Sequence, residues 1–408
     1  MQADGVRLIP LEDDATLIPS TLYAPRPRDQ LDDDTLELTS EVLDQLKFGE
    51  AALEEYLLEP TEGYFVKSPK SFLGAPGITE EIKGRFITVV AAMMANVKRF
   101  ADADLPEPVD QVVIGRPINF QGAGGEAENQ QALQMLVAAA REAGFEEIRF
   151  LYEPMAAAME YEARLQTEEC VLVLDIGGGT TDCSFVRVGP ERRALREREN
   201  DILGHAGERL GGNDYDQLLG LIALSPQLGY GKILRSGLPV PNNYFVDAVS
   251  TNDVNAQQRF FSARMKDRLR QCAMDGVPEV SRLCTLQEGR MTYRFMQSAE
   301  LAKITLTDWE QAEVNLSYIE QGLCAYATRA QLRESCDRLL VHLDALVREV
   351  VTQAGSQPDV VYLTGGMAKS AVVRTYLRTV LPNMRTVDSD HFASVTEGLT
   401  LWAERVYD

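Results

Sequence analysis

Short apolar runs alternate with amphipathic stretches through the middle of the chain. The runs QVVIG (111–115) and IRFLY (148–152) have the length and the residue types of buried strands. Residues 126–143 repeat apolar positions at helical spacing, and Glu153-Pro154 opens another helical stretch, with proline in a first turn that tolerates it. Together with the apolar run VLVL (171–174), this alternation predicts an α/β fold.

The flanking regions carry the same patterns less regularly. Strands are expected in GVRLIPL near the N-terminus, in YFVK (64–67) and in VVYLTGG (360–366). The charged run ERRALRERE (191–199) is expected to be a solvated connection. Little periodicity is present between residues 222 and 260, so no helix bounds are predicted there. The remaining helices are expected at 41–58, 79–101, 290–305, 331–353, from Ser370 onward and 394–406.

Composition and charge narrow the class of protein. The 408 residues are enough for two domains with substantial cores, and 45% hydrophobic with 25% charged residues is ordinary for a globular chain. A formal net charge of −22 without a basic stripe argues against nucleic-acid binding. No apolar run is long enough to span a membrane, and the first residues, which lack a basic segment followed by an apolar one, are not expected to be a secretion signal. Six cysteines without a C-x-x-C pair and three separated histidines argue against zinc and favour a reducing, cytoplasmic compartment.

The stretch VLVLDIGGGTTDCS (171–184) is the most informative for chemistry. A turn without side chains lets backbone N–H groups approach an anion closely, and threonine hydroxyls add donors. Asp175 and Asp182 flank the turn, where carboxylates can hold a hydrated Mg²⁺. The glycines alone would favour an ordinary hairpin turn. With the two aspartates and two threonines they favour a phosphate-binding turn. The turn consists of Gly177, Gly178, Gly179, Thr180 and Thr181.

Two further glycine pairs follow in the chain. Gly365 and Gly366 end an apolar run directly before a helical stretch, and Gly211 and Gly212 precede two acidic residues in RLGGNDYD. Each pair alone is better explained as a tight turn, although a helix N-terminus favours an anion. Three such sites in one chain favour a nucleotide site instead. No G-x-G-x-x-G fingerprint and no Walker A loop is present, so the Rossmann and P-loop types are excluded.

In combination, these motifs resemble the actin-like ATPase superfamily, in particular its heat shock protein 70 (DnaK) branch. The segments KSPKSFLGAPG and GRPINFQG look most like the YegD-type chaperones of that branch. The resemblance implies an α/β actin-like ATPase fold of two lobes, each with a mixed sheet flanked by helices, and a nucleotide cleft between them. It implies lobe I at 1–165 plus 386–408, and lobe II at 166–385 with a mostly helical subdomain at about 217–305. The matching segments are LDIGGGTTDCS, YEPMAAAMEY (152–161), VYLTGGMAKSAVVR (361–374), SAELAKITLT (298–307) and VIGRPINF (113–120).

The resemblance also implies roles for single residues in the hydrolysis of ATP to ADP and phosphate. Lys70 would orient the attacking water, and Glu153 would hold water and metal; without the resemblance they read as an exposed lysine and a helix-start carboxylate. Asp175 and Asp182 would bind Mg²⁺ through water and relay protons, and Thr180 would bond the γ-phosphate. Glycines would line the phosphate and nucleoside sides of the cleft, and three residues would meet ribose and adenine. These glycines are Gly177, Gly178, Gly179, Gly211, Gly212, Gly365 and Gly366, and the adenosine residues are Glu300, Lys303 and Thr307.

The chain departs from the family pattern in several places. The family begins with a strand and a G-x-D-x-G-T loop, and this loop is not found from Met1 onward. We therefore expect that the gene start has been placed too late and that ATPase activity of the sequence as given is weak. Ile304 stands where the family has an arginine that stacks on adenine, Met367 replaces a small polar residue and Phe392 an acidic one. The family's β-rich peptide-binding domain is not recognised up to Asp408, so the chaperone role is expected to rest on the resemblance of the ATPase half alone.

Three functions remain open on the sequence alone. The first is an ATP-dependent chaperone or switch, with protein clients or co-chaperones as partners. The second is a non-catalytic scaffold or filament-type protein of the same fold. The third, a sugar or acetate kinase, needs an acceptor pocket that the sequence does not locate. The set Lys70, Glu153, Asp175 and Asp182 favours the first, because a scaffold has no need to retain it.

Overall fold

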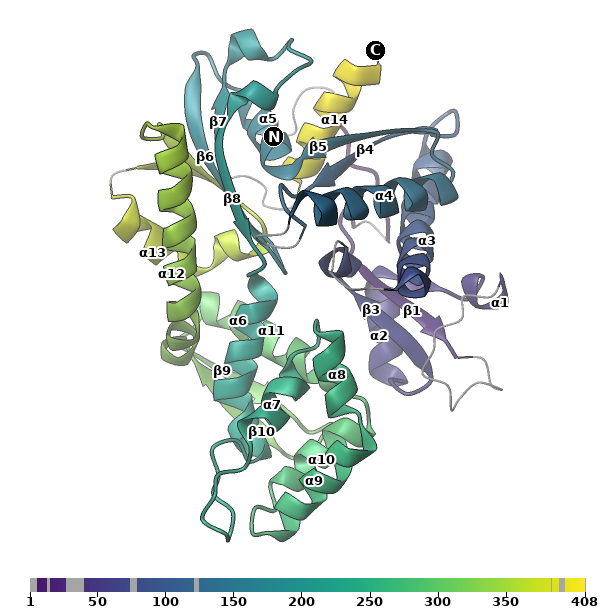
Figure 1. The fold of residues 1–408 in the computed structure, drawn as a ribbon, viewed down its shortest axis with the longest axis vertical. Helices are drawn as coiled ribbons and strands as arrows, with labels where there is room; N and C mark the ends of the chain where they lie inside the picture. Colours follow the sequence, from purple (N-terminus) through teal and green to yellow (C-terminus); the bar gives the residue numbers. More distant parts are fainter. Residues whose placement is uncertain are drawn as a thin grey trace.

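The chain folds into two lobes that lie side by side, with lobe I on the right and lobe II on the left of Figure 1. This computed structural model describes residues 6–12, 15–26, 40–73, 79–120, 125–382, 384–388 and 393–407. Helices and several sheets alternate along the chain. The predicted α/β class and its two-lobed, actin-like arrangement are confirmed. The mixed sheet predicted for lobe I is wrong for the described residues, because its antiparallel strands and its parallel strands pair in two separate sheets. The predicted lobe boundaries at 165 and 385 stay a prediction.

Lobe I carries its strands in two sheets. One is antiparallel with the strand order β2-β1-β3, and the other is a parallel pair, β4-β5. The strands are β1 Thr21–Pro25, β2 Lys47–Phe48, β3 Gly63–Lys67, β4 Gln111–Arg116 and β5 Glu147–Tyr152. The helices are α1 Ser40–Leu43, α2 Gly49–Leu58, the 3₁₀ turn η1 Pro69–Phe72, α3 Glu80–Asp104 and α4 Glu126–Glu142.

Lobe II is built on a five-stranded mixed sheet in the order β12-β11-β6-β7-β8. Its central hairpin alternates between two cores, because successive strand residues point to opposite faces. Val171 and Val173 join one core, whereas Leu172 and Leu174 join the other, and all four are fully buried. The strands are β6 Glu169–Ile176, β7 Thr181–Val188, β8 Ile202–Glu208, β11 Val360–Thr364 and β12 Arg385–Asp388.

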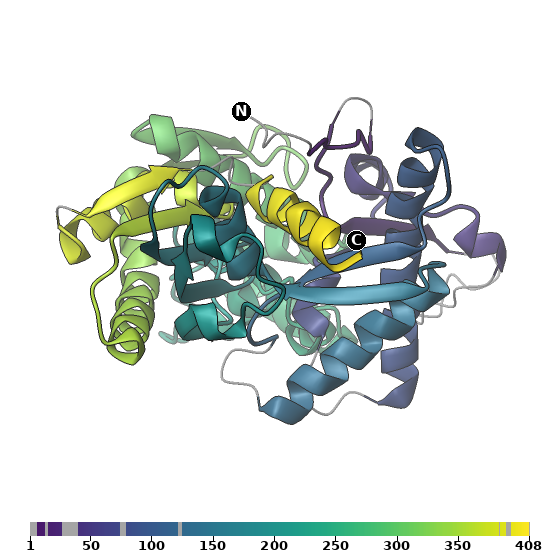
Figure 2. The ribbon, with the colours of Figure 1, turned by 90° about the horizontal axis from the view of Figure 1, so that it is seen from above.

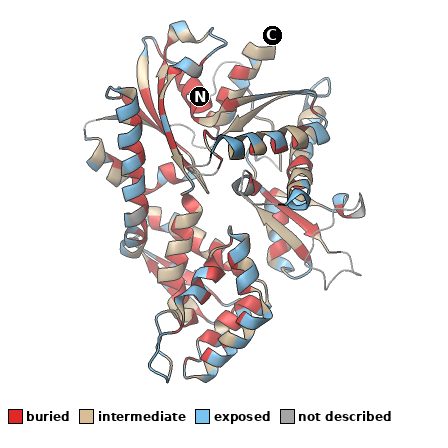
Figure 3. Ribbon diagram, in the orientation of Figure 1, coloured by how far each residue is buried: buried red, intermediate tan, exposed pale blue. Residues whose placement is uncertain are grey.

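Helices cover both faces of this sheet. The helix α5, Glu153–Glu162, packs against α14, Ser394–Tyr407, which also contacts β4 and so joins the two lobes (Figure 2). Nearly all of α5 is buried, and Figure 3 shows the buried residues gathered on α5 and the central strands. The opposite face packs on α6 Gly212–Leu219, α12 Arg329–Ala354 and α13 Ala371–Val380.

A mostly helical part forms the lower end of lobe II in Figure 1. Its apolar side chains belong to the same core cluster as the inner face of the large sheet. The helices are α7 Asn242–Val249, α8 Val254–Phe260, α9 Ala263–Met274, α10 Val280–Glu288 and α11 Thr292–Asp308, and the strands are β9 Gln311–Asn315 and β10 Cys324–Thr328. Short turns are η2 Pro190–Arg192, η3 Glu199–Asp201, the π-turn η4 Gly220–Leu224, η5 Ser225–Leu228 and η6 Gly366–Lys369.

Two expectations for the N-terminal region are wrong. The predicted helix 41–58 is broken, because Lys47 and Phe48 pair with β1 and Gly49 adopts φ +60°, a conformation that does not continue a helix. The predicted strand in GVRLIPL is not formed within residues 6–11, and the first strand begins at Thr21. A strand needs a hydrogen-bonded neighbour, and no described strand pairs with this segment.

The charged segment 191–199 is not simply solvated. Arg198 is 3% exposed and donates to both carboxylate oxygens of Glu162, at 2.9 and 3.0 Å. Arg193 donates to the backbone carbonyls of Glu162 and Leu165. A buried carboxylate on α5 requires a cationic partner, and this connection provides it.

Candidate functional site

The glycine turn joins β6 to β7 and brings two carboxylates together. In the hairpin register Asp175 lies opposite Asp182, and Ile176 lies opposite Thr181. The N–H of Gly177 donates to the carbonyl of Thr180 at 2.9 Å and closes the turn. The strand pairing therefore fixes the two carboxylates next to each other at the end of the hairpin.

Burial and nearby charges perturb both carboxyl groups. Burial, together with the negative charge of Glu153, raises the pKa of Asp175 to about 7 against the attraction of Lys70. The pKa of Asp182 is also raised to about 7 by burial, opposed by Lys70 and by a hydrogen bond from Thr180. Two crowded carboxyl groups with raised pKa values form a site that favours a cation.

Lys70 and Glu153 complete this cluster from lobe I and the connecting helix. The Lys70 Nζ donates to both carboxylate oxygens of Glu153, at 2.6 and 2.7 Å. Loss of water around Lys70 lowers its pKa, but the attraction of Glu153, Asp182 and Asp175 outweighs this, so the pKa is raised. Lys70 thus stays protonated, and four predicted catalytic residues interact electrostatically at one place.

The acid cluster suits a hydrated Mg²⁺ better than a fully protein-ligated metal. Among the described residues, no group of three or more His, Cys, Asp or Glu side chains has the arrangement of a metal site. Mg²⁺ usually keeps several waters and needs only one or two carboxylates. Asp175 and Asp182 therefore fit a water-bridged Mg²⁺.

The glycine pair 211–212 packs against the first turn. The amides of Gly212 and Asn213 donate to the carbonyls of Gly177 and Gly178, at 2.8 and 2.7 Å. A side-chain carbon on Gly211 would lie 2.8 Å from the carbonyl oxygens of both turn residues. This segment therefore supports the turn through its backbone, and only glycine permits the approach.

Gly365 meets the same hairpin from β11. It adopts φ +82°, and a side-chain carbon there would lie 2.4 Å from the carbonyl oxygen of Ile176 and 2.7 Å from Oδ1 of Asp175. Gly366 follows as the first residue of η6, ahead of α13. The structure thus brings all three glycine segments together at the carboxyl end of β6.

The three predicted adenosine residues on α11 have different surroundings. Glu300 lines a cavity of about 470 Å³ between the lobes. Lys303 donates to Asp216 at 3.0 Å and to the carbonyl of Gly212 at 3.3 Å. Thr307 lies outside the lining residues described for this cavity, and its carbonyl accepts a hydrogen bond from Arg329.

The cavity extends from the glycine turn to an apolar end. Gly178 and Asn213 line the end at the glycine turn. Leu301 and Ile304, which are 57% and 56% exposed, line the apolar end. Sequence reasoning missed the polar lining residues Lys67, Asn213 and Asp216. Burial raises the pKa of Asp216 to about 6, opposed by Lys303. The position of Asp216, four residues after Gly212, was the available signal, because one helical turn places both on the same side of α6.

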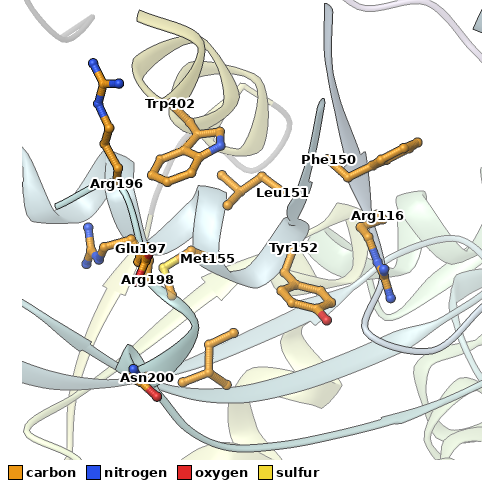
Figure 4. Close-up of a pocket in the computed structure, with 11 residues that line it drawn as sticks. Arg116, Phe150, Leu151, Tyr152, Met155, Arg196, Glu197, Arg198, Asn200 and Trp402 are labelled. Carbon is orange, nitrogen blue, oxygen red and sulfur yellow. The ribbon is translucent and has the colours of Figure 1, made fainter. Parts of the chain in front are cut away.

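A second cavity, of about 490 Å³, lies elsewhere in the molecule (Figure 4). Trp402, Tyr152 and Phe150 surround it with two rim arginines, Arg116 and Arg196. Its lining contains none of the predicted site residues. The chemistry therefore points to the smaller cavity beside the glycine turn.

Residues 75–223 match the family model described as Hsp70 protein. This segment is similar to Hsp70 proteins. The matched segment contains Glu153, the glycine turn and the pair 211–212, whereas Lys70 and the α11 residues lie outside it. The match confirms the family resemblance and supports an Hsp70-like nucleotide-binding module; the YegD-type assignment stays a prediction.

Phe392 lies outside the described residues. No described helix has an apolar stretch sufficient for a transmembrane span.

Proposed function

We propose that this chain binds ATP with Mg²⁺ and hydrolyses it to ADP and phosphate. The observation that carries the proposal is the cluster of Lys70, Glu153, Asp175 and Asp182 beside the glycine turn. A base whose pKa lies near the working pH is well suited to proton transfer. The raised pKa values of the two aspartates, both about 7, meet that requirement.

In the proposed reaction, the oxygen of a water molecule attacks the γ-phosphorus, and the bond to the β-phosphate oxygen breaks. Lys70 and Glu153 orient the water, and a carboxylate of the aspartate pair accepts its proton. Asp175 and Asp182 would hold Mg²⁺ through water, and the ion would supply positive charge that offsets the charge on the phosphates. Catalysis therefore comes from positioning and electrostatic stabilisation, with no covalent enzyme intermediate.

Two measurements test this proposal. MgATP is expected to raise the thermal unfolding midpoint by mass action. Phosphate release is expected in the same protein and is expected to fall on the order of 100-fold in Asp175→Asn. Asp44→Asn, at an exposed position in lobe I, is the matched control. If the unchanged chain shows no thermal shift and releases no phosphate, the proposal is contradicted. Binding without turnover would favour the scaffold alternative.

The chaperone or switch role belongs to the same proposal. Nucleotide state would change how the lobes close about the connecting helices α5 and α14. Protein clients or co-chaperones are the partners, and the cytoplasm is the compartment. A chaperone is expected to slow aggregation of an unfolded protein in an ATP-dependent way. Equal aggregation with ATP and without nucleotide would leave the switch role and remove the chaperone role.

A further inference from the structure

One ion pair crosses the cavity between the lobes. Lys67, the last residue of β3, places Nζ 3.1 Å from Oε2 of Glu300 on α11. Both side chains line the cavity that reaches the glycine turn at Gly178. The resemblance to the Hsp70 family assigned a role to Glu300 and none to Lys67.

The turn after β3 directs two lysines to different parts of the cleft. Ser68 follows Lys67 with φ 54°, an uncommon conformation for a residue other than glycine. Lys70 then lies in η1 and donates to both carboxylate oxygens of Glu153. Lys70 therefore serves the carboxylate cluster, whereas Lys67 serves the cavity beside it.

Lys67 is the only Lys or Arg among the described residues that line this cavity. A phosphate chain held there needs a cation from the wall, and Lys303 is already committed to Asp216, whose side chain is 6% exposed. The Lys67–Glu300 pair is different, because its side chains are 32% and 36% exposed. Water reaches about a third of each side chain, so the pair is only weakly stabilising.

We propose that Lys67 binds the phosphate chain of the nucleotide, leaving Glu300 when the ligand enters. The freed carboxylate of Glu300 then accepts hydrogen bonds from ligand hydroxyl groups. Charge-assisted hydrogen bonds to phosphate are stronger than the half-buried ion pair that they replace. The inference rests on the proposed nucleotide binding and extends it to a residue outside the family's assignments.

The lobes keep other contacts when Lys67 is changed, so a binding defect can be assigned to the ligand. Phe65 and Tyr293 meet across the lobes with ring centroids 5.1 Å apart, and Tyr56 stacks on Phe65 at 4.5 Å. The Tyr56 hydroxyl also donates to the carbonyl of Arg290 at 2.7 Å. These contacts do not involve the lysine.

The test compares MgADP with adenosine, which has no phosphate, by calorimetric titration. Lys67→Met is expected to weaken MgADP about tenfold and to change adenosine affinity less than about twofold. Lys67→Arg is expected to recover most of the loss. Lys47→Met is the control and is expected to change neither affinity, because Lys47 pairs with Glu55 in lobe I outside the cavity lining.

The two ligands separate the alternatives. Equal weakening of both would show that Lys67 acts by holding the lobes together, and an unchanged MgADP affinity would show that it does not meet phosphate; either result overturns the inference. If the unchanged chain binds neither ligand, the proposed function fails and this inference fails with it. Nearly equal unfolding midpoints of the variants without ligand are expected, since this partly solvated pair adds little stability.

Discussion

Asp175 and Asp182 lie opposite each other across the β6–β7 hairpin, and each has a pKa raised to about 7. The pairing of the two strands thus holds two carboxyl groups where water screens their charges poorly. The folded protein accepts protons there that the unfolded chain, with ordinary aspartate pKa values, releases. The hairpin is therefore sensitive to both protons and cations.

This coupling predicts a pH-dependent response to Mg²⁺. Because the folded pKa values are raised, the aspartates favour folding below about pH 4, and this contribution is lost as pH rises through about 7. Mg²⁺ binds the ionised carboxylates, so the Mg²⁺-dependent part of stabilisation by ADP is expected to be small at pH 5 and larger at pH 8. Scanning calorimetry of the ADP complex with and without Mg²⁺ at the two pH values measures this difference in the unfolding midpoint. An equal Mg²⁺ effect at the two pH values, or one retained in Asp175→Asn, would contradict this assignment.

Lys70→Met is expected to separate turnover from binding. The variant removes the cation that contacts Glu153 at 2.6 and 2.7 Å. If Lys70 orients the attacking water, single-turnover hydrolysis falls on the order of 100-fold while ADP affinity changes only a few fold. Lys83→Met, which removes a surface pair with Glu80 on α3, is the control. A variant that hydrolyses ATP at the unchanged rate would remove Lys70 from the mechanism.

Much of the fold could be predicted because the central strands are buried on both faces. Val171 to Leu174 form a continuous apolar run with no exposed side chain, which is the pattern of strands inside an α/β sheet. The strand β8, with the sequence ILGHAGE, could not be predicted in this way. It lies at the edge of the sheet, and its small and polar residues resemble those of a loop.

The candidate site was predictable where its chemistry lies in short motifs and not where it depends on tertiary contact. The aspartates and the glycine turn are neighbours in sequence, so one stretch shows them together. Lys67 and Glu300 are 233 positions apart, and their contact exists only because the two lobes meet. Arg198 looked like a solvated charge because nothing nearby in sequence indicates the buried Glu162.

Gly365→Ala is expected to destabilise the protein strongly. A side-chain carbon there would lie 2.4 Å from the backbone oxygen of Ile176, and φ is +82°. The backbone must shift beside Asp175, so a loss of roughly 2–4 kcal/mol in the free energy of unfolding is expected from urea titration. Gly355→Ala is the matched control: φ there is +66° with nothing within 4 Å, so only about 1 kcal/mol is expected. Equal losses in the two variants would mean that the close packing at Gly365 does not add to the cost of the substitution.

Arg198→Met is expected to show how much the buried ion pair on α5 matters. Arg198 and Glu162 have side-chain exposures of 2% and 0%, so the substitution leaves a carboxylate buried without its main partner. The expected loss in free energy of unfolding is about 3–5 kcal/mol. Adding Glu162→Gln should recover part of it, because the unpaired charge is then removed. The exposed pair of Arg348 and Asp344 gives the control, and Arg348→Met should cost no more than about 1 kcal/mol. If Arg198→Met alone behaves like this control, the segment 191–199 is a solvated connection after all.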